Sequence, residues 1–331
     1  MLPCEGFIQC QMVMMRPSSG IELYKQRLEA LKAGLIHTQL PPDSFPSVWE
    51  GSMGHPTYEQ WKILLEREAK AVAAVQGKDC LSVMLGDSLC LWFPVDLLPP
   101  GQLWLNQGIY GDNTAGILKR LSALADNRIH DVYMMVGIND IRQGRSDATI
   151  INNLRHIVGR IRMHHICAKV FLLSVLPTRL AALPNTRIRQ INSKIEVLAR
   201  QDGAIYIDLN TPFTDAEDML REDFTDDGVH VNFAAYQLWQ QVMEQTTSRL
   251  ALQRDDRYQH WLRQSHRFTF NGKHYVWMPY QVSHGETLEE IAMKTLGKSD
   301  VHHYDLIAIK NNINYTGLPH NETIYIPREI A

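Results

Sequence analysis

The chain has 331 residues, of which 45% are hydrophobic and 21% are charged, and its formal net charge is −3. This length exceeds that of most single domains, so we expect a main domain accompanied by a smaller one. The near-neutral charge leaves no electrostatic footprint for nucleic acid or for an anionic membrane, which favours a small or neutral partner.

The cysteines and the first residues of the chain indicate in which cellular compartment the protein is expected. The cysteines are odd in number and form no Cys-x-x-Cys pair, and we interpret them as reduced thiols: Cys4, Cys10, Cys80, Cys90 and Cys167. The first residues lack a basic segment followed by an apolar stretch, so we expect no signal peptide. No apolar run approaches the roughly 18 residues of a membrane span. These features predict a cytoplasmic protein without a transmembrane segment.

Residues 1–77 form the first predicted unit, a helical extension with a proline-rich connector. Apolar residues at helical spacing predict a short helix over residues 21–33. Four prolines between residues 34 and 56 favour an irregular segment, because proline is excluded from helix interiors and central strands. Thr57 and Gln60 form a capping box, which predicts the start of a longer helix.

Residues 78–251 alternate between short apolar runs and amphipathic patterns. The apolar runs predict strands at 81–85, 103–105, 132–136, 170–175 and 205–207. The amphipathic patterns predict helices at 114–125, 148–163, 185–200 and 233–250. This alternation predicts an α/β fold with a mainly parallel sheet that helices cover on both faces.

Four short motifs follow the predicted strands, where ligands bind in open parallel sheets. They are Gly86-Asp87-Ser88-Leu89, Asn106-Gln107-Gly108-Ile109-Tyr110-Gly111-Asp112, Gly137-Ile138-Asn139-Asp140 and Asp227-Gly228-Val229-His230. Each motif alone has a structural explanation, such as a helix cap at Ser88 or a turn at Asp227-Gly228. Their common position after strands indicates that they converge at one site.

The residue types in these motifs suit acyl transfer. A serine hydroxyl needs an adjacent base and a group that orients the base, and Ser88, His230 and Asp227 supply the three roles. Negative charge that develops on a carbonyl oxygen needs fixed donors. The backbone amides of Ser88 and Gly111 and the side-chain amide of Asn139 are the predicted oxyanion hole.

The four motifs resemble those of the SGNH hydrolases, also called GDSL esterases and lipases, over about residues 78–250. The resemblance implies a flavodoxin-like three-layer α/β/α sandwich, with Ser88 as nucleophile, Asp227 and His230 completing the triad, and Gly111 and Asn139 as oxyanion donors. Family activities include removal of O-acetyl groups from carbohydrates, lysophospholipid and arylester hydrolysis, and thioester cleavage. The reaction class follows from the resemblance, and the substrate does not.

The alternation of apolar and amphipathic segments ends at residue 251. Residues 252–278 are predicted to be a linker with a β-hairpin around Asn271-Gly272, since both turn positions favour positive φ. Residues 279–331 read as strand, helix, helix and strand, an order that resembles a LysM domain. That resemblance implies binding of glycans that contain N-acetylglucosamine, in a groove formed by Gly285, Glu286, Thr287, Asn312, Ile313 and Asn314. Such a partner would associate the chain with the cell envelope.

The hypothesis is a serine ester hydrolase without cofactor or metal, acting on a small ester or an acylated carbohydrate of the cell wall. His164, His165 and Cys167 do not form a predicted metal site, because no second ligand pair is spaced for one. One alternative is a lysophospholipase, thioesterase or arylesterase of the same family. Another is a catalytically silent glycan-binding protein that keeps the hydrolase fold as a scaffold.

Overall fold

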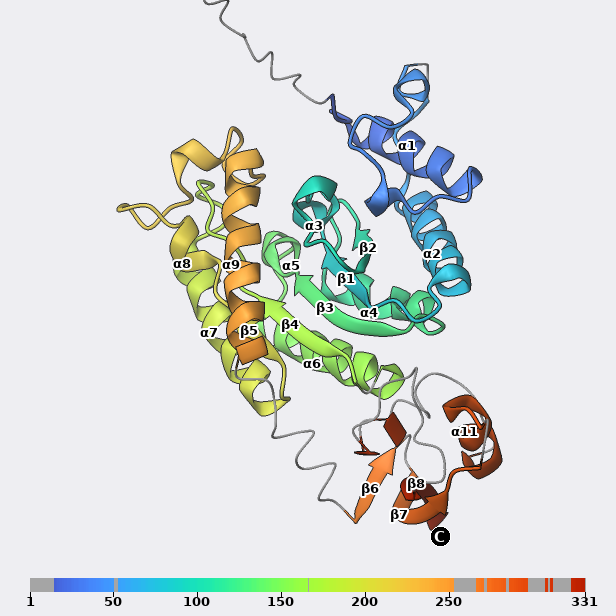
Figure 1. The fold of residues 1–331 in the computed structure, drawn as a ribbon. Coiled ribbons are helices and arrows are strands. Elements are labelled where there is room, and N and C mark those ends of the chain that lie inside the picture. The colour runs from blue at the N-terminus through green and yellow to red at the C-terminus, as the bar shows by residue number, and fades with distance from the viewer. Residues whose placement is uncertain are drawn as a thin grey trace, which may run out of the picture.

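A computed structural model shows a parallel α/β domain, preceded by a helical extension and followed by a smaller antiparallel unit (Figure 1). The structure describes residues 15–50, 53–165, 167–252, 266–270, 273–283, 286–296, 307–308, 310–311 and 323–330. None of the helices in this part of the chain combines the length and the apolar character needed to cross a bilayer.

The centre of the domain is a five-stranded sheet in the order β2-β1-β3-β4-β5, and every neighbouring pair is parallel. The strands are β1 Leu81–Gly86, β2 Leu103–Gly108, β3 Ile129–Met135, β4 Lys169–Leu173 and β5 Ile205–Ile207. This order is that of flavodoxin-like doubly wound sheets. The predicted parallel sheet is confirmed, and its strands start and end within a few residues of the predicted bounds.

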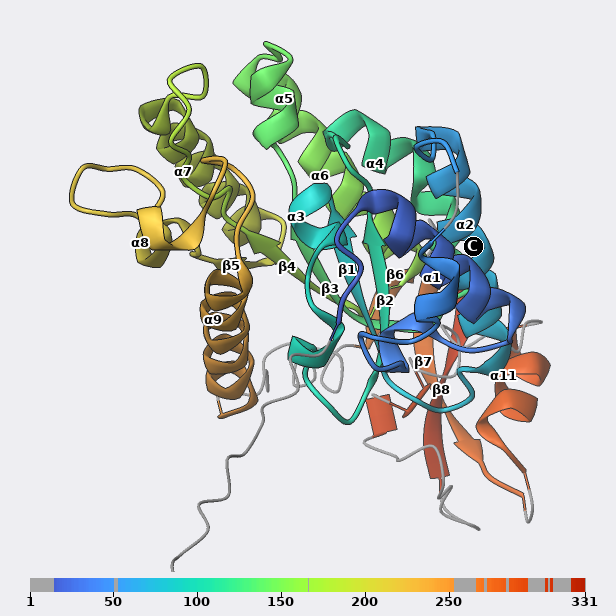
Figure 2. The same cartoon turned by 90° about the horizontal axis from the view of Figure 1, so that it is seen from above.

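Helices cover both faces of the sheet. Their bounds are α3 Ser88–Leu91, α4 Thr114–Arg120, α5 Ile138–Arg142, α6 Asp147–His164, α7 Asn185–Gln201, α8 Asn210–Phe213 and α9 Phe233–Leu252. Figure 2 shows α4, α6 and α7 on one side of the sheet and α9 on the other. The predicted helix over 114–125 is divided, because α4 gives way to a 3-10 turn at Leu121–Leu124.

Successive side chains of a strand point to opposite faces of the sheet, so the strand residues contribute alternately to two separate hydrophobic cores. Val83 and Val132 pack with α4, α6 and α7, whereas Met84 and Tyr133 pack with α3, α8 and α9. Trp239 of α9 is fully buried in the second core. Because β1 and β3 are buried on both faces, their carboxyl ends are held firmly where the motifs begin.

The N-terminal extension lies against the edge of this domain. Its helices, α1 Gly20–Lys32 and α2 Tyr58–Val75, match the predicted ones, and the capping box of Thr57 with Gln60 is present. The buried Arg27 guanidinium of α1 pairs with Glu68 of α2 and donates to the Asn106 carbonyl at 2.7 Å. The extension is thereby joined to β2, the strand that leads into the second motif.

The C-terminal unit is a three-stranded antiparallel sheet, β6-β7-β8, with α11 Leu288–Leu296 packed on it. β6 Arg267–Phe270 and β7 Lys273–Gln281 form the predicted hairpin, although its Asn271-Gly272 turn lies outside the described residues. β7 also pairs with β8 Thr323–Ile330. The boundary predicted between residues 278 and 279 therefore lies within β7, a strand that pairs with both β6 and β8.

Candidate active site

Ser88 occupies the first turn of α3, directly after β1. Asp87 caps this helix, and its carboxylate accepts a hydrogen bond from the Leu89 amide at 3.0 Å. Gly86 is required at the end of the strand, because a Cβ atom there would lie 2.2 Å from the Met135 carbonyl oxygen. Tight packing of β1 against β3 thus sets where the nucleophile turn begins, and the Ser88 side chain is left 6% exposed.

Asp227 and His230 lie in one loop that is tied together by its own hydrogen bonds. One carboxylate oxygen of Asp227 accepts from the Val229 and His230 amides at 2.9 and 2.7 Å. The other lies 2.6 Å from Nδ1 of the His230 ring. The Thr225 hydroxyl donates to the His230 carbonyl at 2.6 Å and accepts from the Gly228 amide at 2.9 Å. The loop therefore fixes the imidazole orientation locally.

The same hydrogen bonds control the charge of Asp227. Partial burial alone would raise the pKa of this carboxyl. The hydrogen bond from the His230 ring and those from the two amides outweigh burial and lower the pKa to about 2. Asp227 is therefore ionised throughout the neutral range, as an orienting carboxylate must be.

The two halves of the site meet between Ser88 and His230. The Ser88 hydroxyl oxygen lies 3.1 Å from Nε2 of His230, although the residues are 142 positions apart in the chain. With Nδ1 protonated and facing Asp227, Nε2 is left as the acceptor for the serine proton. The structure thus brings Ser88, His230 and Asp227 into one chain of hydrogen-bonding contacts.

Gly111 and Asn139 lie on the loops that follow β2 and β3. Gly111 has φ of +73°, a conformation that favours glycine, and an added Cβ would meet no heavy atom within 4 Å. The Asn139 amide donates to the Asp112 carbonyl at 2.9 Å, which uses one of its two N–H groups. The Asn139 side chain is therefore held beside the Gly111–Asp112 segment with one N–H left for another acceptor.

A buried ion pair supports this segment, and the sequence patterns do not single it out. The Arg120 guanidinium of α4 donates to Asp112 at 2.8 Å and to the Gln107 and Gly86 carbonyls at 2.7 and 3.2 Å. Both side chains of the pair are almost fully buried. One arginine thereby ties the ends of β1 and β2 to the loop that carries Gly111. In the sequence the pair is marked only by an aspartate shortly before the helix and an arginine eight positions later.

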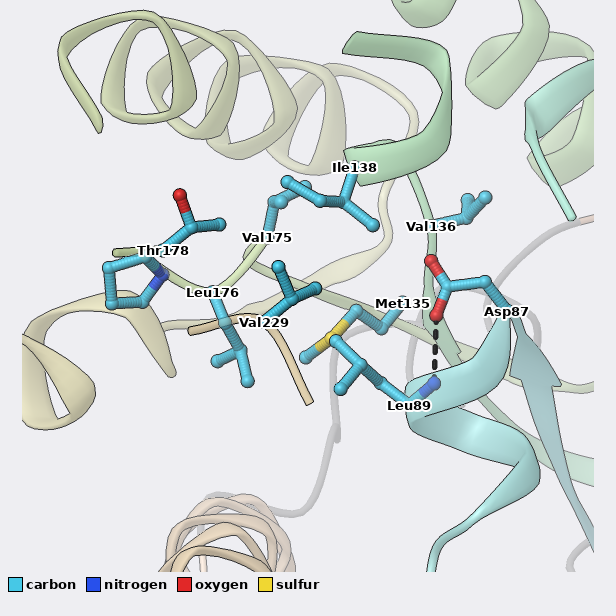
Figure 3. A pocket seen from close by; sticks show the side chains of 10 residues that line it. Asp87, Leu89, Met135, Val136, Ile138, Val175, Leu176, Thr178 and Val229 are labelled. Carbon is cyan, nitrogen blue, oxygen red and sulfur yellow. Dashed lines mark hydrogen bonds between the residues drawn. The ribbon is translucent and has the colours of Figure 1, made fainter. Parts of the chain in front are cut away.

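Asp87 is buried in apolar surroundings beside the nucleophile. Figure 3 shows it at a small cavity with Leu89, Ile138 and Val229, the neighbours of Ser88, Asn139 and His230 in the chain. Its second carboxyl oxygen has no hydrogen-bond partner among the described residues. Burial raises the pKa of Asp87 to about 7, and the nearby Asp112 and Asp140 add to the rise. The first sequence motif contains this aspartate, but nothing in the motif indicates that its pKa is raised.

Two of the residues predicted to bind glycan have bonding partners within the C-terminal unit. The Glu286 carboxylate accepts from the Tyr280 hydroxyl and the Ser283 amide, each at 2.8 Å, and pairs with Lys294. The Thr287 hydroxyl accepts from the Glu290 amide at 3.2 Å in a capping box at the start of α11. The other predicted groove residues lie outside the described part of the chain: Gly285, Asn312, Ile313 and Asn314.

Comparisons with known proteins address the parallel domain. Residues 84–238 match the model of the GDSL-like Lipase/Acylhydrolase family, a span that contains all five predicted catalytic and oxyanion residues. The search of curated proteins found no match. A solved structure of a candidate platelet activating factor from Streptococcus pneumonia is 20% identical, over 57% of this chain and 93% of that one, with a TM-score of 0.51. This similarity shows a shared fold.

Two further solved structures carry lipase names. A GDSL-like lipase from Bacteroides thetaiotaomicron is 20% identical over 56% of this chain and 97% of that one, with a TM-score of 0.47. A lipase/acylhydrolase from Enterococcus faecalis is 23% identical over 51% and 96% of the two chains, with a TM-score of 0.45.

Proposed function

We propose that this chain, of which residues 84–238 match the model of the GDSL-like Lipase/Acylhydrolase family, is a carboxylic ester hydrolase that cleaves O-acyl esters through an acyl-enzyme on Ser88. The observation that carries the proposal is the unbroken series of contacts from the Ser88 hydroxyl to His230 at 3.1 Å and from His230 to Asp227 at 2.6 Å. In this proposal His230 is the base and Asp227 orients it.

Acylation begins when the serine oxygen attacks the ester carbonyl carbon while its proton passes to Nε2 of His230. The resulting imidazolium faces the ionised Asp227 carboxylate, which stabilises it. When the tetrahedral intermediate collapses, the bond to the alcohol oxygen breaks and His230 returns the proton to that oxygen. The alcohol leaves, and the acyl group stays on Ser88.

Three donors are proposed to stabilise the negative charge of the intermediate: the amides of Ser88 and Gly111 and the second N–H of Asn139. The Ser88 amide lies in the first turn of α3, and the Asn139 side chain is oriented by its bond to the Asp112 carbonyl. Donors that are already fixed need no reorganisation during the reaction. Loss of one such donor typically lowers turnover by about 100-fold to 1000-fold.

Deacylation repeats the same steps with water in place of the alcohol. His230 takes a proton from a water molecule, the water oxygen attacks the acyl carbon, and the bond to the Ser88 oxygen breaks. The proton returns to Ser88 and a carboxylic acid is released. Each proton and leaving group is thereby accounted for without a metal or a cofactor.

Ser88→Ala tests this proposal. We expect the variant to lose hydrolysis of p-nitrophenyl acetate and labelling by a fluorophosphonate, because both need the serine oxygen. Ser122→Ala, at an exposed serine of the same domain, is the matched control and should keep both. Circular dichroism checks that the two variants are folded. Labelling that survives in Ser88→Ala would refute the assignment of the nucleophile.

We also propose acylated cell-wall carbohydrate as the substrate class and glycan binding by the C-terminal unit. Support comes from the order β7, α11, β8, and from Ile307 and Ala308, which pack into the same small core. Pull-down of the full chain with a glycan containing N-acetylglucosamine, together with an ester panel of increasing acyl length, tests both. Glycan binding without esterase activity would favour the silent scaffold, and activity confined to long acyl chains would favour a lysophospholipase or thioesterase.

A further inference from the structure

Tyr110 projects from the loop that carries Gly111 although its neighbours point inward. Ile109 is 1% exposed and Asp112 is 3% exposed, whereas Tyr110 is 61% exposed. Ile109 packs with Trp61 and Leu91, and Asp112 is held by Arg120. The buried residues Ile109 and Asp112 thus anchor the loop, and the Tyr110 ring is not part of the hydrophobic core.

The exposed ring is stacked on the candidate base. The centroids of the Tyr110 and His230 rings lie 5.9 Å apart, and the ring planes differ by 19°. No hydrogen bond of the Tyr110 hydroxyl to another described residue accompanies this contact. A large aromatic side chain that is mostly in water and touches the catalytic imidazole is placed where a bound molecule would cover it.

Stereochemistry restricts which part of an ester can reach this ring. If His230 returns a proton to the departing alcohol, the alcohol oxygen must come within hydrogen-bond distance of Nε2. The carbonyl oxygen faces the amide of Gly111, the residue next to Tyr110. The alcohol group therefore leaves the reacting carbon on the side of the imidazole, beside the ring stacked on it.

We propose that Tyr110 forms a wall of the alcohol subsite and selects esters whose alcohol carries a flat or apolar ring face. The inference rests on the proposed function, because it uses Ser88 as nucleophile and His230 as proton donor to the alcohol. A ring face can lie against Tyr110, whereas a short alkyl alcohol is too small to cover it. An aryl alcohol and the apolar face of a sugar ring share this property, so either source fits.

Three acetyl esters separate the alcohol subsite from the rest of the reaction. Phenyl acetate carries an aryl alcohol, methyl 6-O-acetyl-glucopyranoside carries a sugar ring, and ethyl acetate carries neither. All three give the same acetyl-enzyme, so differences in kcat/KM arise while the alcohol is still bound. For each ester, kcat/KM of the variant is divided by that of the wild type, so differences in chemical reactivity between the esters cancel.

Tyr110→Ala and Tyr110→Leu remove the ring, and Tyr110→Phe keeps it. We expect the first two to lower kcat/KM for at least one ring-bearing ester about threefold to tenfold more than for ethyl acetate, mainly through KM. Tyr110→Phe should keep the wild-type selectivity. Leu180→Ala, at a 38% exposed apolar residue beside Gly228, is the control and should not change it.

The outcomes are distinct. A loss confined to phenyl acetate supports the proposal with an aryl alcohol, and a loss confined to the acetylated sugar supports it with a carbohydrate. Equal losses on all three esters, or none, would overturn it, because the ring would then act only through His230 or not at all. Failure of the proposed function looks different, since the wild type would then lack Ser88-dependent activity on every ester.

Discussion

Two aspartates lie next to the proposed nucleophile and the proposed base, and their environments are opposite. Asp87 precedes Ser88, is fully buried, and has its pKa raised to about 7 by burial. Asp227 lies in the His230 loop with a side chain that is 54% exposed, and hydrogen bonds from His230 and two amides lower its pKa to about 2 against the effect of burial. One fold therefore raises the pKa of one carboxyl and lowers the pKa of its counterpart within a single site.

The difference extends to the two sides of the site. The nucleophile side, comprising Ser88, Gly111 and Asn139, is supported by buried groups such as the Asp112–Arg120 pair. The base side, residues 225–230, is supported mainly by hydrogen bonds within its own loop. Substitutions on the base side should therefore affect activity more than stability, and substitutions beneath the nucleophile side should affect stability first.

The largest effect is expected for Asp227→Asn on the base side. The amide can still accept from the Val229 and His230 backbone, but it no longer offers a charge to Nδ1 of the imidazole. If Asp227 orients the base as proposed, kcat/KM on p-nitrophenyl acetate should fall by about 10⁴-fold, the loss typical of the same substitution in a serine triad. The free energy of unfolding in urea should change by less than about 1 kcal/mol, since the side chain is exposed.

The adjacent aspartate provides the control for this prediction. Asp226→Asn removes another exposed negative charge one position earlier and should leave turnover within a few-fold of the wild type. If Asp227→Asn keeps more than a tenth of the activity, the orienting role belongs to another group. If it unfolds the domain, the contrast between the two sides does not hold.

Arg120→Leu tests the nucleophile side. It leaves the buried Asp112 carboxylate without its ion pair and removes donors from the Gly86 and Gln107 carbonyls. Breaking one partner of a buried pair typically costs about 3 to 5 kcal/mol, and urea unfolding followed by tryptophan fluorescence measures the loss. Lys119→Leu, at the exposed preceding residue of α4, should cost less than about 1 kcal/mol.

A double variant sharpens the result. Asp112→Asn combined with Arg120→Leu removes both charges of the pair, so part of the stability lost in Arg120→Leu should return. Additive losses would show that the arginine stabilises the domain through the strand-end carbonyls alone. Partial recovery would show that an unpaired carboxylate causes most of the destabilisation.

The sequence predicted the parallel fold and three residues that the structure brings together, Ser88, His230 and Asp227, but not the contacts that support them. The strands around Val83 and Val132 are mostly apolar, and the motif residues follow them directly. The helices α3, α5 and α8 were not predicted, because four or five residues are too few for a periodic signal. The Asp112–Arg120 pair joins the loop after β2 to the end of α4, and the Tyr110–His230 stack joins two loops that are far apart in the chain. No periodic sequence pattern marks either contact.

The smallest expected effect concerns the protonation of Asp87. Its folded pKa lies above the unfolded value of 3.8, so the proton is bound more tightly in the folded state. The resulting stability is fully present below about pH 4 and is lost as the pH rises through about 7. The difference in pKa corresponds to at most about 4 kcal/mol, given about 1.4 kcal/mol for each pH unit. Asp87→Asn cannot ionise and should lack this slope.

Urea unfolding of the wild type and Asp87→Asn from pH 4 to 8 measures that slope. The stability of the variant relative to the wild type should rise across this range, because only the wild type must bury a charge at the higher pH. Asp126→Asn, at an exposed aspartate of the same domain, controls for removal of a carboxylate. Parallel pH profiles for the two variants would show that Asp87 is solvated or paired in solution. Asp87 and Asp227 would then differ in position and burial but not in the direction of their pKa shifts.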